Sequence, residues 1–185
     1  MSLHLILGGV RSGKSSYAQR LASVHRHVLY VATANAKDEG MEDRVRKHQA
    51  DRPEGWKTLE AYRDFSQHKE FFREADFVIV DCLTLMMSRL LFEKEEKVEH
   101  FEWPPEEVKK MEEIIYSQIE ELLDTLEGIP CAIVSNEVGL GVIPESWLGN
   151  IFRDISGRAH QMVAKRASRV TLMVAGYPLK VKEEV

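Results

Sequence analysis

A glycine-rich stretch near the start of the chain has the residue types and spacing of a phosphate-binding loop. Residues 8–15 follow the pattern G-x-x-x-x-G-K-S, directly after an apolar run and directly before a helical pattern. In that setting backbone N–H groups wrap a polyphosphate, and the helix N-terminus adds partial positive charge. The alternative is a glycine-rich turn that only joins a strand to a helix. The expected nucleotide contacts in this loop are Gly8, Gly9, Val10, Arg11, Ser12, Gly13, Lys14 and Ser15.

Two side chains of this loop have distinct expected tasks. Lys14 can reach the outer phosphates of a nucleotide, and the Ser15 hydroxyl is the expected ligand to Mg²⁺. A second acid-bearing position could share the metal, because Asp81 closes the apolar run at residues 77–80. The same position suits an N-cap for a helix beginning near residue 83, so both roles stay open. Thr84 is open in the same way, between a hydroxyl near the site and an ordinary first-turn residue.

His48 is a candidate for chemistry at phosphorus. With Met41 and Val45 it shares one face of a helix predicted over about residues 38–50. Positive charge around an imidazole favours anionic phosphates and keeps the imidazole neutral, so it could act as a general base or a nucleophile. The alternative is a half-buried histidine in a basic surface stretch. The basic neighbours are Arg44, Arg46, Lys47 and Arg52.

The elements that must position these residues alternate between apolar runs and amphipathic stretches. Strands are predicted over residues 3–7, 28–33, 76–81, 131–135 and 170–175, with a short edge strand over 56–61 and a short tail after Pro178. Helices are predicted over residues 14–24, 38–50, 64–75, 83–92, 104–127 and 145–167, with a charge-dense loop over 93–102. This alternation predicts a single α/β domain, residues 1–185, with a mostly parallel sheet covered by helices on both faces.

Polar segments follow several of these strands, where ligands gather in parallel sheets. Thr33, Ala34 and Asn35 follow the second strand, and residues 136–144 form a glycine-containing loop after a later one. That loop does not complete a dinucleotide fingerprint, because Pro144 stands where the third glycine would be.

Composition excludes several classes of protein. The formal charge of −5 argues against a protein that coats nucleic acid. No apolar run approaches the roughly 18 residues of a membrane span, and the N-terminal run lacks the basic flank of a signal peptide. Cys82 and Cys131 are isolated in apolar runs, which favours buried free thiols in a reducing cytoplasm over a disulfide or metal site.

The motifs also separate reaction classes. No Asn-Lys-x-Asp motif of a guanine-reading switch occurs, and the one Asp-x-x-Gly, at residues 154–157, lies in a helical pattern. No added module for mechanical work is visible. A compact P-loop kinase or nucleotidyltransferase acting on a small molecule therefore fits best. A kinase without nucleotidyl transfer and a nucleotide-dependent regulatory switch protein are the alternatives.

Over almost its whole length the chain resembles the bifunctional adenosylcobinamide kinase/adenosylcobinamide-phosphate guanylyltransferase family of cobalamin biosynthesis. The resemblance depends on five blocks, of which the last two, in this order after the loop, are more specific than the loop alone. They are residues 7–15, residues 30–33, residues 41–53 with His48 inside, residues 81–85, and residues 135–144 extended by 152–155.

The resemblance implies two reactions that use nucleoside triphosphates, with ATP and GTP as substrates and Mg²⁺ as cofactor. The hydroxyl of the aminopropanol arm of adenosylcobinamide, a corrinoid, is phosphorylated. GMP is then transferred from GTP onto that phosphate, which gives adenosylcobinamide-GDP and pyrophosphate. In the family a histidine of an Arg-x-x-x-His block carries GMP covalently, and the matching residue is His48.

The resemblance also implies further nucleotide contacts and an assembly. The family has a RecA-like sheet and forms trimers, so a homotrimer in the cytoplasm is expected, with no nucleic acid partner and no membrane span. Asp81, with Ser15, is the expected Mg²⁺ site. The further residues expected at the nucleotide are Thr33, Ala34, Asn35, Gln49, Ala50, Asp51, Arg52, Glu60 and Asp81.

The chain departs from the family pattern at a few positions. Arg89 and His160 each stand where the family usually has Asn, and Ser168-Arg169 replaces a common Asp-Glu. Gly149-Asn150 departs from a more basic run. None of these positions lies in the phosphate loop or at His48.

Overall fold

A seven-stranded sheet forms the centre of the molecule in the computed structural model, which describes residues 2–34, 55–92 and 103–183. Its strand order is β3-β2-β4-β5-β1-β6-β7. The strands are β1 (Leu3–Gly8), β2 (Val28–Ala32), β3 (Lys57–Glu60), β4 (Phe77–Asp81), β5 (Cys131–Asn136), β6 (Arg169–Val174) and β7 (Tyr177–Glu183).

The first six strands run parallel, so their carboxyl ends lie at one edge of the sheet. This confirms the predicted mostly parallel α/β fold, and β3 lies at one end of the sheet, as the predicted edge strand should. The prediction of a tail after Pro178 was wrong, because β7 pairs antiparallel with β6. Gly176, at φ 89°, allows the tight turn between the two strands. Pro178 is tolerated because β7 lies at the open edge of the sheet.

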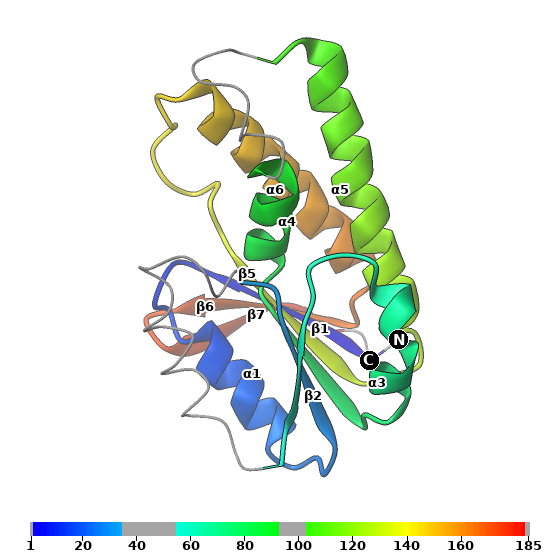
Figure 1. The fold of residues 1–185 in the computed structure, drawn as a ribbon. Coiled ribbons are helices and arrows are strands. Elements are labelled where there is room, and N and C mark those ends of the chain that lie inside the picture. The colour runs from blue at the N-terminus through cyan, green and yellow to red at the C-terminus, as the bar shows by residue number, and fades with distance from the viewer. Residues whose placement is uncertain (1, 35–54, 93–102, 184–185) are drawn as a thin grey trace.

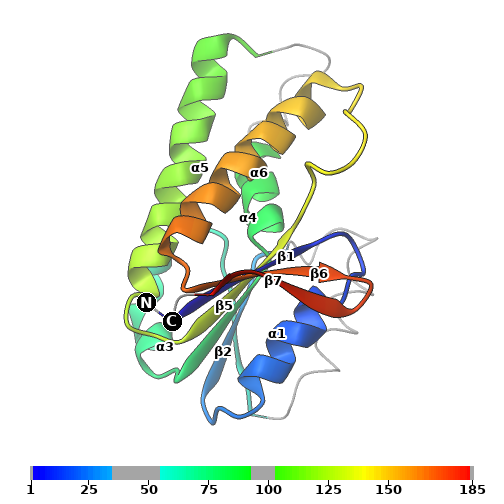
Figure 2. The same ribbon diagram turned by 180° about the vertical axis from the view of Figure 1, so that it is seen from behind.

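Helices cover both faces of the sheet (Figures 1 and 2). Helix α1 (Lys14–Ala22) covers one face, and α4 (Leu83–Phe92), α5 (Pro105–Thr125) and α6 (Trp147–Arg166) cover the other. Helix α5 buries Met111, Ile115 and Ile119. The predicted helix over 38–50 and the loop over 93–102 lie outside the described residues. None of the described helices combines the length and apolarity needed to cross a membrane.

The predicted helix over 64–75 was wrong in detail. The segment forms a 3₁₀ turn, Phe65–His68, followed by the short helix α3 (Lys69–Arg73). Two side chains of α5 accept hydrogen bonds from backbone N–H groups at the start of this segment. The Asp64 N–H donates to Gln118 and the Ser66 N–H to Glu121. These hydrogen bonds join residues that are far apart in the sequence, so the local spacing of apolar residues could not predict them.

The cores on the two sheet faces bury both cysteines. Cys82 packs in the apolar cluster on the α1 face, and Cys131 packs in the cluster under α5. Both thiols are free. Burial raises the pKa of Cys82 to about 11 and the pKa of Cys131 to about 12. The prediction of buried free thiols is confirmed, and their high pKa values keep them protonated and weakly nucleophilic at neutral pH.

His4 makes the stability of this fold sensitive to acid. It is buried in β1 with Nε2 2.7 Å from Thr171 Oγ1, and burial, with the charge of Arg169 adding to it, lowers its pKa to about 4. The unfolded chain binds this proton near pH 6.5 and the folded chain only near pH 4. Stability contributed by the neutral imidazole is therefore present above pH 6.5 and falls between pH 6.5 and 4, by up to about 3 kcal/mol.

The measurement is urea unfolding of the protein and of His4→Gln at pH 7.5, 6 and 4.5. We expect the wild type to lose more stability on acidification than His4→Gln does. The control is His27→Gln, which removes an exposed imidazole and should follow the wild type. If the wild type and His4→Gln lost the same amount of stability between pH 7.5 and 4.5, His4 would not be the source of the acid sensitivity.

Candidate active site

The phosphate-loop sequence lies between the carboxyl end of β1 and the first turn of α1, as predicted. Gly13 has a left-handed backbone, φ 95°, and its carbonyl accepts a hydrogen bond from Tyr17 N at 2.9 Å. The Ser12 carbonyl accepts from Gly176 N at 3.0 Å, so the β6–β7 turn braces the loop from behind. The Ser12 hydroxyl is buried and has no hydrogen-bond partner among the described residues. The loop thus offers an unused polar group where an anion is expected.

Gly8 is required by close packing at the start of the loop. At φ 154°, a Cβ on this residue would lie 2.6 Å from Ser12 Oγ and 2.7 Å from the Met173 carbonyl oxygen. We expect Gly8→Ala to destabilise the fold by about 1–3 kcal/mol, because backbone has to shift, and to weaken nucleotide binding. Urea unfolding and titration with GTP measure the two effects.

The matched control for Gly8→Ala is Gly128→Ala. Gly128 also has a positive φ, 82°, but a Cβ there would meet nothing within 4 Å. Gly128→Ala should lose only the stability that a left-handed backbone costs a residue with a Cβ, about 1–2 kcal/mol. It should bind nucleotide as the wild type does. If Gly8→Ala bound GTP as tightly as this control does, the close packing would be unimportant for the site.

Lys14 is the buried cation of the site. Its ammonium donates to the Gly9 carbonyl at 2.6 Å, and only 6% of the residue is exposed. Burial lowers the pKa of Lys14, and the nearby Cys82 and Asp81 oppose that shift. A desolvated ammonium in the same loop as the unpaired Ser12 hydroxyl is well placed to attract phosphate oxygens.

Two carboxylates end strands at the same edge of the sheet. Asp81 ends β4 and accepts a hydrogen bond from the Tyr30 hydroxyl at 2.5 Å, and Glu60 ends β3 beside Ala32. Asp81 also pairs with Ala32 across the sheet. The structure therefore brings Asp81 and Glu60 to the edge that carries the phosphate loop, while the Asp81 side chain reaches across to β2.

Thr33 supports this edge from inside. It is fully buried, and its hydroxyl donates to the Cys82 carbonyl at 2.7 Å and accepts from Cys82 N at 2.8 Å. Arg89, from α4, donates to the Thr33 and Ala34 carbonyls and lies 3.6 Å from the centre of the Tyr62 ring. Arg89 therefore fixes the exit of β2, a role that the sequence did not reveal.

A buried polar network under the loop after β5 was also missed. Thr84, on α4, lies 3.2 Å from Ser135 through the two hydroxyl oxygens, and His160 Nε2, on α6, lies 2.7 Å from Ser135 Oγ. His160 Nδ1 is 3.8 Å from a carboxylate oxygen of Glu137. Burial lowers the pKa of His160, and Glu137 opposes the shift. A threonine and a serine in otherwise apolar runs were the available signal, but their connection to His160 depends on the fold.

Several predicted site residues are not placed by this structure. They lie outside the described residues and are Asn35, His48, Gln49, Ala50, Asp51 and Arg52.

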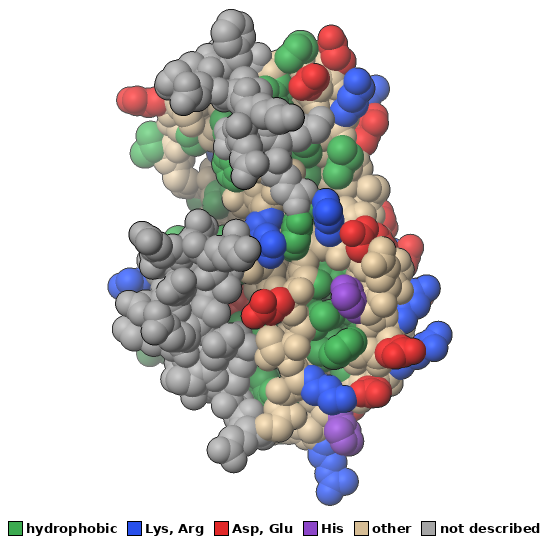
Figure 3. Space-filling view, in the orientation of Figure 1, with side chains coloured by type: hydrophobic (Ala, Val, Ile, Leu, Met, Phe, Trp, Pro, Cys, Tyr) green, Lys and Arg blue, Asp and Glu red, His purple; other side chains and the backbone are tan. Residues whose placement is uncertain are grey.

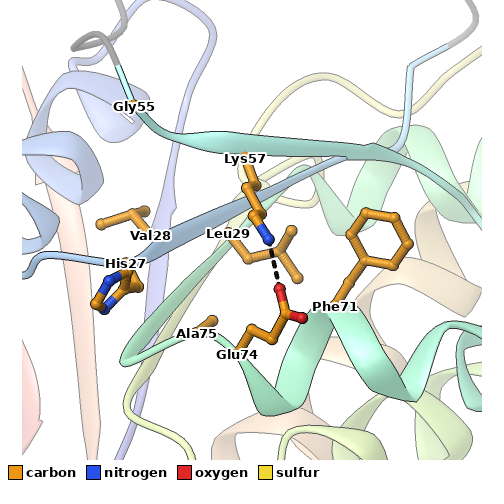
Figure 4. A pocket seen from close by; sticks show the side chains of 8 residues that line it. All are labelled: His27, Val28, Leu29, Gly55, Lys57, Phe71, Glu74 and Ala75. Atoms are coloured by element: carbon orange, nitrogen blue, oxygen red, sulfur yellow. Dashed lines mark hydrogen bonds and ion pairs between the residues drawn. The ribbon is translucent and has the colours of Figure 1, made fainter.

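Other surfaces offer less chemistry. On the described part of the face in Figure 3, acidic and basic side chains are interspersed. Figure 4 shows a hollow at the amino ends of β2 and β3, lined in part by His27, Val28 and Phe71. Lys57 and Glu74 also line it and form an ion pair with each other. That end of the strands is opposite to the phosphate loop, so the hollow is separate from the candidate site.

Comparison with known proteins identifies the family. The sequence model of the family described as cobinamide kinase / cobinamide phosphate guanyltransferase matches residues 4–181. The chain belongs to this family.

Curated relatives support the same assignment. The bifunctional adenosylcobalamin biosynthesis protein CobU of Escherichia coli is 37% identical over 96% of this chain and 98% of its own length. The protein CobP of Pseudomonas aeruginosa, with the same description, is 39% identical over 97% of both chains. The family match over residues 4–181 therefore includes the phosphate loop and the loop after β5.

A solved structure supports the fold. An ATPase of a bacterial type III secretion system covers 92% of this chain with a TM-score of 0.52 and 10% sequence identity, and this chain covers 50% of that protein. At that identity the likeness concerns the fold alone, which is the RecA-like arrangement expected from the sequence.

Proposed function

We propose that this chain phosphorylates adenosylcobinamide with ATP or GTP and then transfers GMP from GTP to the new phosphate. The products are adenosylcobinamide-GDP and pyrophosphate. The observation that carries this proposal is the family match over residues 4–181, which includes an intact phosphate loop at the carboxyl end of β1.

The loop supplies the common part of both reactions. In the kinase step the alcohol oxygen gives up its proton to water and forms a bond to the γ-phosphorus. The bridge to the β-phosphate breaks, and the nucleoside diphosphate leaves. Such a transfer depends on positioning and charge stabilisation more than on covalent chemistry. Lys14 and the backbone donors of residues 8–15 provide both, and the unpaired Ser12 hydroxyl supports a polar ligand there.

We propose Ser15 and Asp81 as the Mg²⁺ ligands. A hydroxyl in the first turn of α1 and a carboxylate at the end of β4 are hard oxygen donors of the kind Mg²⁺ takes, with phosphates and water completing its shell. No cluster of three or more acidic, His or Cys side chains that could hold a metal occurs in the described ranges. When bound, Mg²⁺ would neutralise charge on the phosphates.

We propose His48 as the residue that carries GMP, with Asn35, Gln49, Ala50, Asp51 and Arg52 as nucleotide contacts. Support comes from the family match and the basic sequence around His48. Strand β2 ends at Ala32, and the described chain continues to Ala34 at the same edge of the sheet as Lys14. Arg89 holds that exit. Thr33, Ala34 and Glu60 complete the proposed nucleotide edge.

We propose a homotrimer in the cytoplasm. Free buried thiols suit a reducing compartment. Exposed apolar side chains are available for a subunit interface, and those on the loop after β5 and on β7 are Leu140, Val142, Ile143, Tyr177, Leu179 and Val181. Light scattering that gave the mass of one chain would contradict the trimer.

Product analysis with adenosylcobinamide and GTP tests the function directly. We expect adenosylcobinamide phosphate to appear first and adenosylcobinamide-GDP to follow with release of pyrophosphate. Phosphate product alone would identify a simple kinase. Nucleotide binding without any corrinoid product would favour a regulatory switch protein.

A further inference from the structure

We propose that Asn136 contacts the terminal phosphate of the bound triphosphate through its side-chain amide. The inference depends on the proposed function only in that the loop at residues 8–15 binds a nucleoside triphosphate. It adds a residue from β5 to a site whose proposed phosphate and metal contacts come from β1, α1 and β4.

The position of Asn136 follows from the sheet. Strand β5 lies between β1, which leads into the phosphate loop, and β4, which ends in Asp81. Asn136 is paired with Gly8, the first residue of the loop, and Glu137 N donates to the Gly8 carbonyl at 2.9 Å. Asp81 is paired with Val134, two residues earlier on the same strand. Asn136 thus ends the strand that separates the loop from the metal-binding candidate.

The face on which its side chain lies follows from alternation along β5. Ser135 directs its hydroxyl to Thr84 and His160, on the face covered by α4 and α6. Val134 packs in the cluster on the α1 face, so Asn136 belongs to the α1 face as well. Tyr30, whose hydroxyl binds Asp81, lies in that same cluster. Asn136 is half-buried and lies on the side of the sheet that carries Lys14 and Asp81.

The buried polar network fixes the backbone of Asn136. Its N–H donates to Thr84 Oγ1 at 2.7 Å, and Thr84 is held in turn by Ser135, which is bound to His160. A connected buried network has few alternative arrangements, because any break leaves a polar group without a partner. Thr84 is therefore a positioning residue for Asn136.

The chemistry of a carboxamide suits a terminal phosphate. Its NH₂ group donates without adding charge, and donors fixed in a dry site stabilise phosphate oxygens at no cost of reorganisation. Backbone N–H groups of a phosphate loop cradle the α- and β-phosphates, so a donor at the end of the neighbouring strand is left for the γ-phosphate. Asn136 should therefore help the site to distinguish a triphosphate from a diphosphate.

Calorimetric titration with Mg²⁺ and either a non-hydrolysable GTP analogue or GDP tests this inference. In Asn136→Ala we expect affinity for the triphosphate to fall about tenfold or more, as for loss of a hydrogen bond to a charged group. Affinity for GDP should stay within about twofold. Asn136→Asp keeps the size of the side chain but adds negative charge, and should weaken triphosphate binding further. Its far-ultraviolet circular dichroism spectrum should remain that of the folded wild type.

Thr84→Val and Asn150→Ala complete the design. Thr84→Val removes the hydroxyl with little change of shape and should lower triphosphate affinity in the same direction as Asn136→Ala. Asn150→Ala removes a carboxamide that binds the Pro144 and Ser146 carbonyls, and should change neither affinity.

The outcomes separate this inference from the proposed function. If the wild type bound neither nucleotide, the phosphate site itself would fail. The wild type could instead bind both nucleotides while Asn136→Ala either matched it or lost triphosphate and diphosphate affinity equally. That result would overturn the role of Asn136 and leave the proposed function standing.

Discussion

Lys14→Ala is expected to abolish phosphorylation of adenosylcobinamide and transfer of GMP together. Both steps would use the phosphate loop at residues 8–15, and the Lys14 ammonium is a buried positive charge within that loop. Loss of a single preorganised charge-stabilising group typically costs about 100- to 1,000-fold in rate. The measurement is the initial rate of each product with GTP, scored separately.

The same substitution should not weaken the fold. Burial lowers the pKa of Lys14, so the charged ammonium is less favourable in the folded chain than in the unfolded one at neutral pH. We expect Lys14→Ala to melt at or above the temperature of the wild type while losing activity, as at sites that give up stability for function.

Lys165→Ala is the matched control for Lys14→Ala, because it removes an exposed lysine near the end of α6. It should keep both activities. Retention of either reaction at the wild-type rate in Lys14→Ala would point to a second nucleotide site. A large fall in its melting temperature would mean that Lys14 mainly supports the fold.

The phosphate loop and the parallel sheet could be predicted because their signals are local. A strand, a glycine-rich turn and a helix are contiguous over residues 3–22, and each buried strand reads as an apolar run. Once the strands are parallel, their carboxyl ends share an edge. That is why Asp81 could be proposed for the site from its place at a strand end, whereas Glu60 was expected there only from the family resemblance.

Contacts between distant segments could not be predicted in this way. Strand β7 has apolar residues at alternate positions, but both its faces are largely exposed, so no buried run marks it. The network of Thr84, Ser135 and His160 joins α4, β5 and α6. Its members look unremarkable singly, and only the packing of two helices on one sheet face brings them together.

The departures from the family pattern gain a physical meaning from the same contacts. Arg89 holds the Thr33 and Ala34 carbonyls, and His160 is bound to Ser135 beneath the exit of β5. Both residues support backbone at the carboxyl edge of the sheet. The substitutions at Arg89 and His160 therefore affect how the carboxyl edge of the sheet is held in place, while the loop at residues 8–15 keeps its pattern.

His48→Ala is expected to remove GMP transfer while leaving the kinase step. In the proposed mechanism a neutral imidazole nitrogen forms a bond to the α-phosphorus of GTP, and the bridge to the β-phosphate breaks to release pyrophosphate. The substrate's phosphate oxygen then displaces the imidazole. Without His48 the first bond has no acceptor, so adenosylcobinamide phosphate should accumulate at close to the wild-type rate and the GDP form should be absent.

Labelling with α-³²P-GTP in the absence of corrinoid isolates this step. A phosphoramidate is labile to acid and stable to alkali, so wild-type protein should retain label at high pH and lose it at low pH. His27→Ala removes an exposed histidine at the opposite edge of the sheet and should label normally. Because Lys14→Ala should block labelling through the shared loop and His48→Ala through the missing nucleophile, only the latter should still form adenosylcobinamide phosphate. A His48→Ala protein that still takes up label would place the covalent intermediate on another residue.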